Sequence, residues 1–99
     1  MNKIIFIDKA SEELHAAVKY YNKERPGLGF EFANEVKSTL SRIRLHPEVW
    51  AEIDEGIRKC IVKRFPYALL YLFDNSKIVI IAVMHMKKKP GYWKTRIPN

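Results

Sequence analysis

The chain has 99 residues, of which 47% are hydrophobic, and it carries a formal net charge of +7. This length supports one domain rather than two, and the apolar content argues against disorder. No apolar run approaches the roughly 20 residues that span a bilayer, and a single cysteine, Cys60, excludes an internal disulfide framework or a thiolate metal cluster. We therefore expect one cytoplasmic domain, residues 1–99, with no membrane partner, metal or small-molecule cofactor.

The first half of the chain predicts a short strand and two helices. Residues 3–7 are rich in isoleucine and phenylalanine, as in a strand. An apolar stripe at helical spacing follows, with Asp8 or Ser11 as the expected helix cap. Proline and glycine within 26–29 end this helix, and a second apolar stripe predicts another helix that ends near His46. The short glycine-containing connection predicts an antiparallel helical hairpin.

The second half predicts a β-meander. After an acidic loop at residues 52–55, hydrophobic residues alternate with a period of two. Strands are expected at 57–65, 67–73 and 77–85, with a turn at 74–76 between the last two. Helices followed by strands indicate an α+β fold, with the N-terminal strand and the helical hairpin packed on one face of an antiparallel meander. We expect the N-terminal strand to join the same sheet.

Positive charge is concentrated in the second half. Residues 1–56 hold 8 Lys and Arg against 10 Asp and Glu, whereas residues 57–99 hold 10 against 1, so the net charges are −2 and +9. Such segregation favours a surface that meets nucleic acid or an acidic protein. A merely solvated basic surface is the alternative.

The predicted meander brings basic and aromatic residues to one end of the sheet, which we call the rim. The end of one strand, the start of the next and the end of the third share the rim, so Lys63, Arg64, Tyr67 and His85 should lie there. A basic tail, residues 87–96, leaves from the same place. Cations interleaved with aromatic rings suit the phosphates and stacked bases of single-stranded nucleic acid, and also an acidic groove of a protein.

His85 is the first candidate for catalysis, because it could accept or donate a proton near neutral pH. Cleavage of RNA would need cations at the phosphate as well, and Arg64 and Lys88 could supply them. The simpler interpretation is that His85 only forms a hydrogen bond at a strand end. Similarly, Tyr92 and Trp93 could stack on a ligand or could pin the tail to the sheet. The residues expected to bind nucleic acid or another target are Arg58, Lys59, Lys63, Lys87, Lys89, Trp93, Lys94 and Arg96.

The order of residues along nearly the whole chain resembles toxins of the RelE/ParE superfamily, above all its plasmid-stabilisation branch. In the first half the matching motifs are Ala10-x-x-Glu13-Leu14, Tyr20-Tyr21 and Pro26-Gly27-Leu28-Gly29-x-x-Phe32, followed by Pro47 and Trp50. In the second half they are Ile57-Arg58, Arg64-Phe65-Pro66-Tyr67-x-Leu69-x-Tyr71 and Ala82-Val83-x-His85-x-x-Lys88-x-Pro90-x-Tyr92-Trp93.

This resemblance implies two helices packed on an antiparallel sheet and the toxin half of a type II toxin–antitoxin module. The implied partner is a cognate acidic antitoxin that wraps and silences the toxin. RelE-like members cleave messenger RNA on the ribosome, whereas ParE-like members poison DNA gyrase and are not enzymes, so the target and the enzymatic character stay open. A toxin fold that has lost toxicity and survives as a binding module is the alternative.

RelE-type ribonucleases use basic residues on the first meander strand, an arginine early in the next strand, an arginine after the last strand and a tyrosine in the tail. The early position of the next strand is Ala68 here, and the position after the last strand falls within Lys87–Lys89. The tail position aligns with Trp93, which cannot transfer a proton. The neighbouring Tyr92 could take the place of the family's tyrosine. The first strand offers Arg58, Lys59, Lys63 and Arg64.

Overall fold

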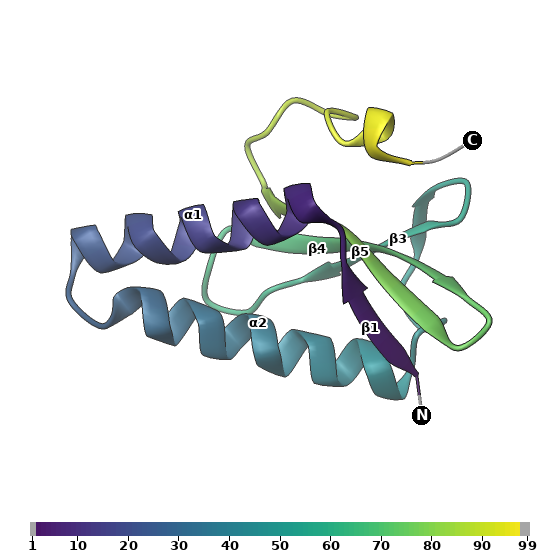
Figure 1. Ribbon diagram of the computed structural model, residues 1–99, viewed down its shortest axis with the longest axis horizontal. Coiled ribbons are helices and arrows are strands. Elements are labelled where there is room, and N and C mark those ends of the chain that lie inside the picture. Colours follow the sequence, from purple (N-terminus) through teal and green to yellow (C-terminus); the bar gives the residue numbers. More distant parts are fainter. Residues whose placement is uncertain (1, 98–99) are drawn as a thin grey trace.

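The protein was analysed as a computed structural model that describes residues 2–97, and Figure 1 shows two antiparallel helices beside a single sheet. The elements in chain order are β1 (Lys3–Phe6), α1 (Asp8–Glu24), α2 (Leu28–Leu45), β2 (Glu52–Asp54), β3 (Ile57–Ile61), β4 (Tyr67–Asp74), β5 (Lys77–His85) and the 3₁₀ turn η1 (Lys94–Arg96). The expected α+β architecture is therefore confirmed.

The helical hairpin agrees with the sequence pattern except at its first cap. Helix α1 begins at Asp8, and its N-cap is Ile7, which makes no side-chain cap hydrogen bond. Asp8 instead lies in the first turn, where its negative charge interacts favourably with the positive end of the helix dipole. The prediction that Asp8 or Ser11 caps the helix was thus wrong. Helix α2 ends at Leu45 with His46 as its C-cap, as expected.

The turn between the helices depends on two glycines for different reasons. Gly27 precedes α2 with φ of 90°, a left-handed conformation that side chains with a Cβ rarely adopt. Gly29 is buried where α2 crosses α1, and a Cβ there would collide with the carbonyl oxygen of Val18 and the side chain of Asn22. The Asn22 amide oxygen accepts a hydrogen bond from the Gly29 N–H at 2.8 Å, which holds the two helices in register.

The sheet has five strands in the order β1-β5-β4-β3-β2, with β1 parallel to β5 and the remaining pairs antiparallel. The expected strand at 57–65 is shorter, because β3 ends at Ile61 and the chain reverses within residues 62–66. Arg64 takes φ of 72° in this reversal, and the Val62 N–H donates to the carbonyl oxygen of Tyr67 at 2.9 Å. The expected acidic loop is also corrected: residues 52–54 form β2, which pairs with β3.

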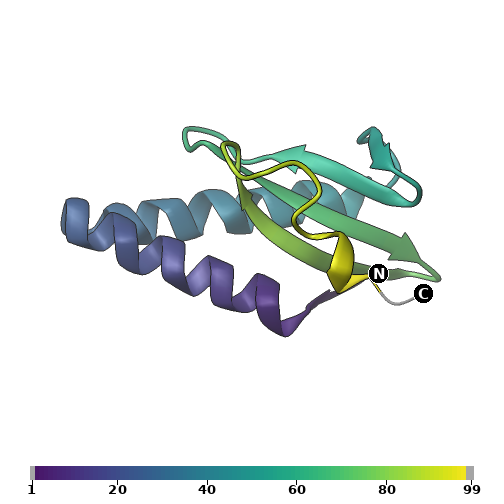
Figure 2. The same ribbon diagram turned by 90° about the horizontal axis from the view of Figure 1, so that it is seen from above.

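Each face of the sheet carries its own hydrophobic core. The larger core lies between the sheet and the helices and includes Phe32, Phe65 and Tyr71. The smaller core lies on the opposite face, where Trp93 of the tail packs on Leu70 and Ile81. Figure 2 shows the tail and α2 on opposite sides of the sheet. Within residues 2–97 there is no helix both long and apolar enough to cross a membrane.

Candidate functional site

The structure confirms that the rim exists as the topology predicts. Tyr67 at the start of β4 pairs with His85 at the end of β5, and the chain from 62 to 66 turns beside them. The Met86 N–H donates to the carbonyl oxygen of Pro66 at 2.8 Å, which ties the start of the tail to this turn. The tail therefore leaves the sheet at the rim.

His85 is half-buried in a groove of about 320 Å³ that runs between α1 and the end of β5. Its ring meets Tyr67 edge to face, with centroids 5.1 Å apart. Its Nδ1 accepts a hydrogen bond from the Lys87 backbone N–H at 3.0 Å, which leaves the ring proton of the neutral form on Nε2. Neutral His85 can thus donate from Nε2, whereas proton uptake at Nδ1 requires that the bond to Lys87 break.

Glu13 of α1 binds the tail to the sheet and is the residue that sequence analysis did not single out for a role. Its carboxylate accepts from the Tyr92 hydroxyl at 2.6 Å and from Arg96 Nη1 and Nη2 at 2.7 and 3.0 Å. It also accepts from the Val83 N–H of β5 at 3.0 Å. The side chains of Arg96 and Glu13 are 11% and 20% exposed, so this is a largely buried ion pair. We call Glu13, Tyr92 and Arg96 the clasp.

The clasp changes the expectation for Tyr92. Burial raises the pKa of its phenol above the usual range, and the hydrogen bond to the Glu13 carboxylate raises that pKa further. A phenol held in its neutral form by a neighbouring carboxylate is poorly suited to release a proton near neutral pH. The predicted catalytic role of Tyr92 is therefore not supported by its surroundings, and its structural role in holding the tail is evident.

Trp93 is buried, whereas a ring that stacks on a ligand would be exposed. Its side chain is 4% exposed and forms part of the smaller core. A side chain buried to this extent among Leu70, Ile81 and Ala82 leaves almost no ring surface on which a base could stack. The alternative in which Tyr92 and Trp93 pin the tail to the sheet agrees with this geometry.

The three arginines of the basic half all bind groups within the protein. Arg58 donates to the carbonyl oxygens of Glu48 and Trp50 at 3.1 and 2.7 Å and so holds the loop after α2. Arg64 forms ion pairs with Glu31 and Glu35 of α2, with Nη2 to Oε1 of Glu31 at 2.8 Å and Nη1 to Oε2 of Glu35 at 3.5 Å. The hydrogen bond from Arg64 lowers the pKa of Glu31.

Arg96, in the clasp, is the third of these arginines, and the Glu13 hydrogen bond raises its pKa. Its Nη1 also reaches the carbonyl oxygen of Ile81 at 3.2 Å. We predicted that Arg58 and Arg96 bind a target and that Arg64 takes part in catalysis. In the structure, each of these side chains already binds a group within the protein. Each arginine joins segments distant in sequence, as its planar fork of donors allows.

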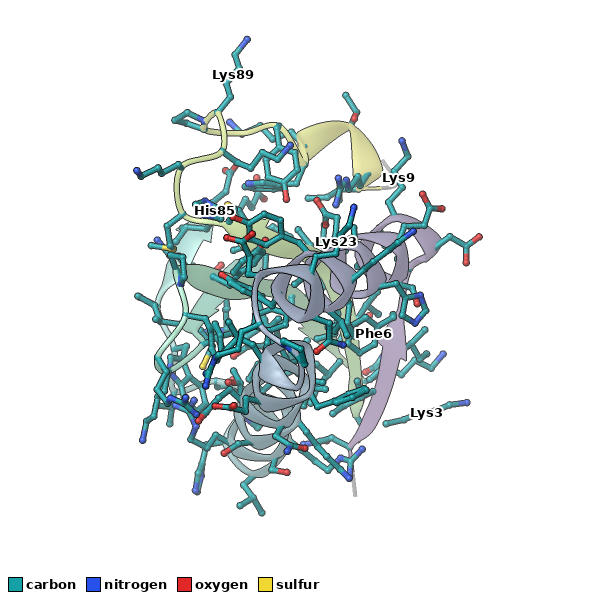
Figure 3. The ribbon with its side chains drawn as sticks, turned by 90° about the vertical axis from the view of Figure 1, so that its left-hand side faces the viewer. Lys3, Phe6, Lys9, Lys23, His85 and Lys89 are labelled. Carbon is teal, nitrogen blue, oxygen red and sulfur yellow. The ribbon has the colours of Figure 1, made fainter. Side chains whose placement is uncertain are left out.

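Lysines supply the rest of the positive charge. Lys94 forms an ion pair with Asp54, its Nζ 3.5 Å from Oδ2, and no ion pair is found for the other candidate lysines within residues 2–97. Lys63, Lys87, Lys88 and Lys89 are exposed, and Lys89 projects from the tail loop in Figure 3. The ammonium of Lys88 lies over the Tyr92 ring, 5.5 Å from its centroid.

A second groove, of about 460 Å³, crosses the sheet face opposite the helices, under the tail. Its floor includes Met84 and Met86, and three lysines line it: Lys59, Lys88 and Lys94. Asp54 is also in the lining and is paired with Lys94. Lys88 borders this groove and the one that holds His85. The free positive charge thus surrounds the rim on both sides of the tail.

The acidic β2 region has no geometry for a metal. No cluster of three or more potential metal ligands occurs within residues 2–97. Glu52 and Asp54 instead accept hydrogen bonds from the backbone N–H groups of Gly56 and Glu55, at 2.7 and 2.8 Å. Those carboxylates serve the turn into β3.

Comparison with known proteins adds a family and a fold. Residues 4–90 match the family model described as ParE toxin of type II toxin-antitoxin system, parDE. Among solved structures, the chain is similar to one from the chromosomal ParDE TA system from P. aeruginosa, at 16% identity and a TM-score of 0.75. That similarity covers 86% of this chain and 96% of the other, and it shows a shared fold. No curated protein matches the sequence.

Proposed function

Because the chain belongs to the ParE toxin family of type II toxin–antitoxin systems, we propose that it inhibits growth by binding DNA gyrase without catalysing a reaction. We further propose that a cognate acidic antitoxin keeps it inactive. The resemblance to ParE-like toxins implies gyrase as the target, and the alternative is cleavage of ribosome-bound messenger RNA by the rim.

One observation carries the choice between these targets: Tyr92, Arg64 and the Nδ1 of His85 are each bound to a different partner, so the groups left free at the rim are its lysines and the Nε2 of His85. Tyr92 donates to Glu13, and Arg64 is paired with Glu31 and Glu35. His85 keeps its Nδ1 occupied by the Lys87 N–H. General acid–base catalysis needs groups that are free to exchange protons in a shared geometry. These three residues face different partners, which supports a toxin that acts by binding.

The free lysines support binding to an acidic surface. Lys63 and the run Lys87–Lys89 are exposed around a tail that the clasp holds in one position. Cations carried on a backbone held in place attract an anionic partner and orient it on approach. The same surface would serve the antitoxin and the target in turn, so occupation by one excludes the other.

The target is tested in two assays run side by side, the first with purified protein and the second in cells. One measures the supercoiling activity of DNA gyrase, and the other maps RNA ends after the chain is induced in growing cells. We expect inhibition of gyrase and no new RNA ends. RNA cleavage that is lost in His85→Ala combined with Lys88→Ala would establish the ribonuclease alternative.

Three variants separate binding from proton transfer. Replacing Lys87, Lys88 and Lys89 by Gln should abolish growth arrest, because it removes three of the exposed positive charges beside the rim. His85→Gln and Tyr92→Phe should keep growth arrest, because neither is needed to move a proton. Loss of toxicity in Tyr92→Phe, in a chain that is still folded, would argue against the proposal.

Neutralisation is tested by inducing the chain alone and together with a neighbouring gene for a small acidic protein. We expect growth arrest in the first case and rescue in the second. Normal growth in both cases would show instead that the toxin fold survives as a binding module without toxicity.

A further inference from the structure

The groove that holds His85 is the feature on which this inference rests. It has a volume of about 320 Å³ and lies between α1 and the end of β5, on the helix side of the sheet. Figure 3 views the molecule from this end and places His85 between α1 and the tail. A groove of this volume is at the small end of the range in which proteins bind small molecules. We therefore ask which small molecule its lining would accept.

Much of the groove is lined by aromatic rings. Tyr20 and Tyr67 belong to its lining, and Tyr21 contacts both of them edge to face, with ring centroids 5.3 and 6.2 Å away. Tyr67 meets the ring of His85 in the same manner. The remaining apolar lining is made of small aliphatic side chains, Ala16, Ala17 and Val83. The body of a ligand here would be apolar and flat, because a further ring extends the same edge-to-face packing.

The polar groups that remain free in the groove are hydrogen-bond donors. The Lys88 ammonium forms no ion pair within the part of the chain that the structure describes, and neutral His85 presents its ring N–H at Nε2. In residues 2–97 the tyrosine hydroxyls with hydrogen-bond partners are those of Tyr71 and Tyr92, so the hydroxyl of Tyr67 is also available. Burial raises the pKa of Tyr67, so this phenol keeps its proton. Three donors therefore favour a ligand that accepts hydrogen bonds.

The one carboxylate in the lining, that of Glu13, is already occupied. Its Oε1 accepts from the Val83 N–H and from Arg96, at 3.0 and 2.7 Å. Its Oε2 accepts from the Tyr92 hydroxyl and from Arg96, at 2.6 and 3.0 Å. Because Arg96 also balances its charge, the positive charge of Lys88 is the one left for a ligand. This balance favours a monoanion over a cation.

We propose that this groove is a binding site for a small aromatic carboxylate. The Lys88 ammonium and the Nε2–H of His85 hold the carboxylate, and Tyr20 and Tyr67 pack against the ring. A phosphate monoester carries close to two negative charges at pH 7, which one lysine matches less well. The proposal is independent of whether the target of the toxin is gyrase or RNA.

The test titrates the full-length chain, labelled with ¹⁵N, with benzoate and with 3-phenylpropanoate. We expect at least one of these acids to give saturable shifts in the amide signals of Ala16, Val83 and His85. Benzamide, which is flat but neutral, and acetate, which is charged but has no ring, should each bind about tenfold more weakly or worse. The site is refuted if neither acid gives a saturable shift, or if acetate binds as well as benzoate. Tighter binding of phenyl phosphate than of both acids would overturn the choice of a carboxylate.

Substitutions of single lysines provide the matched controls. Lys88→Gln should weaken binding of the aromatic acid about tenfold, because it removes the charge that the carboxylate meets. Lys89→Gln makes the same change in net charge at the next residue, which is not in the lining, and should have little effect. Lys59→Gln tests the groove under the tail, which Lys88 also borders. If Lys59→Gln or Lys89→Gln weakens binding as much as Lys88→Gln, the proposed site is wrong.

A change in the aromatic lining tests the second half of the proposal. Tyr20 is 56% exposed, so Tyr20→Ala leaves the core intact and should keep the melting temperature nearly unchanged. We expect it to weaken binding of the aromatic acid severalfold and to leave the weak binding of acetate as it was. Unchanged affinity for the aromatic acid in this variant would show that the ring does not pack where we place it.

Discussion

The clasp gives the sharpest test of how the tail is held. Replacing Glu13 by Gln keeps the volume of the side chain and removes its charge. The Glu13 carboxylate accepts two hydrogen bonds from Arg96, at 2.7 and 3.0 Å, and one from the Tyr92 hydroxyl at 2.6 Å, whereas the glutamine amide keeps only one acceptor oxygen. At least one of these donors then faces an amide NH₂ group. Arg96 is left as a largely buried cation without a counter-charge.

The expected cost follows from this geometry. Removing one partner of a buried ion pair costs about 3–5 kcal/mol, and the partial exposure of Glu13 places the loss near the lower end, about 3 kcal/mol. For a domain of this length such a loss lowers the melting temperature by about 15 °C. Urea-induced unfolding followed by far-UV circular dichroism measures the loss directly.

Glu12→Gln is the matched control, because Glu12 is its neighbour on α1 and is exposed. We expect it to change the stability by less than about 0.5 kcal/mol. The double variant Glu13→Gln with Arg96→Met should cost clearly less than the sum of the two single variants, since each single change leaves the other group unpaired. A loss below about 1 kcal/mol for Glu13→Gln, or additive effects in the double variant, would refute the clasp.

Substitutions at three further positions test other parts of the fold. Tyr71→Phe removes a hydroxyl that donates to the carbonyl oxygen of Pro47 at 2.7 Å and should cost about 1 kcal/mol in urea unfolding. Burial raises the pKa of Tyr71 to about 12 from 10.0. The contribution of the Tyr71 hydroxyl to stability is therefore complete below pH 10 and is lost as pH rises toward 12. The phenylalanine variant should lose less stability between pH 10 and pH 12. Gly29→Ala should lower the melting temperature strongly, because its Cβ would strike the backbone of Val18, and an unchanged melting temperature would contradict the helix crossing. Arg64→Gly should melt at a higher temperature than Arg64→Ala, since φ of 72° favours glycine, and the reverse order would show that the turn has another conformation.

The elements that sequence predicted well are those with a strong local pattern. The helical hairpin follows from apolar stripes that end at proline and glycine, and β4 and β5 follow from alternating residues around a two-residue turn. Asn75 and Ser76 both have positive φ there, as hairpin turns require. The rim was predictable as well, because the connectivity of an antiparallel meander determines which strand ends lie together.

The errors occurred where distant contacts outweigh local preference. Val62 and Phe65 are residue types that favour a strand after Ile61, yet the chain reverses at Arg64, and its ion pairs with α2 stabilise that reversal. The residues of β2 are acidic and exposed, so only pairing with β3 makes them a strand. Glu13 carried a signal that could have been used: it is a carboxylate beside Ala10, Leu14 and Ala17, on the face that packs into the protein.

The division between arginine and lysine connects the fold to the proposed function. From the sequence alone, Arg58, Arg64 and Arg96 are predicted to form one cationic surface with the lysines, because each carries the same charge. In the structure these arginines hold the loop after α2, the turn after β3 and the tail. A bidentate fork suits such fixed internal partners, whereas the ammonium of lysine is a mobile point charge. Apart from Arg64, which is 54% exposed but paired with Glu31 and Glu35, the charges exposed around the rim are lysines, which can follow the contour of an acidic partner. With the one rim arginine held by two carboxylates, no unpaired fork is left to clamp a phosphate in a transition state, and this favours a toxin that binds its target over one that cleaves it.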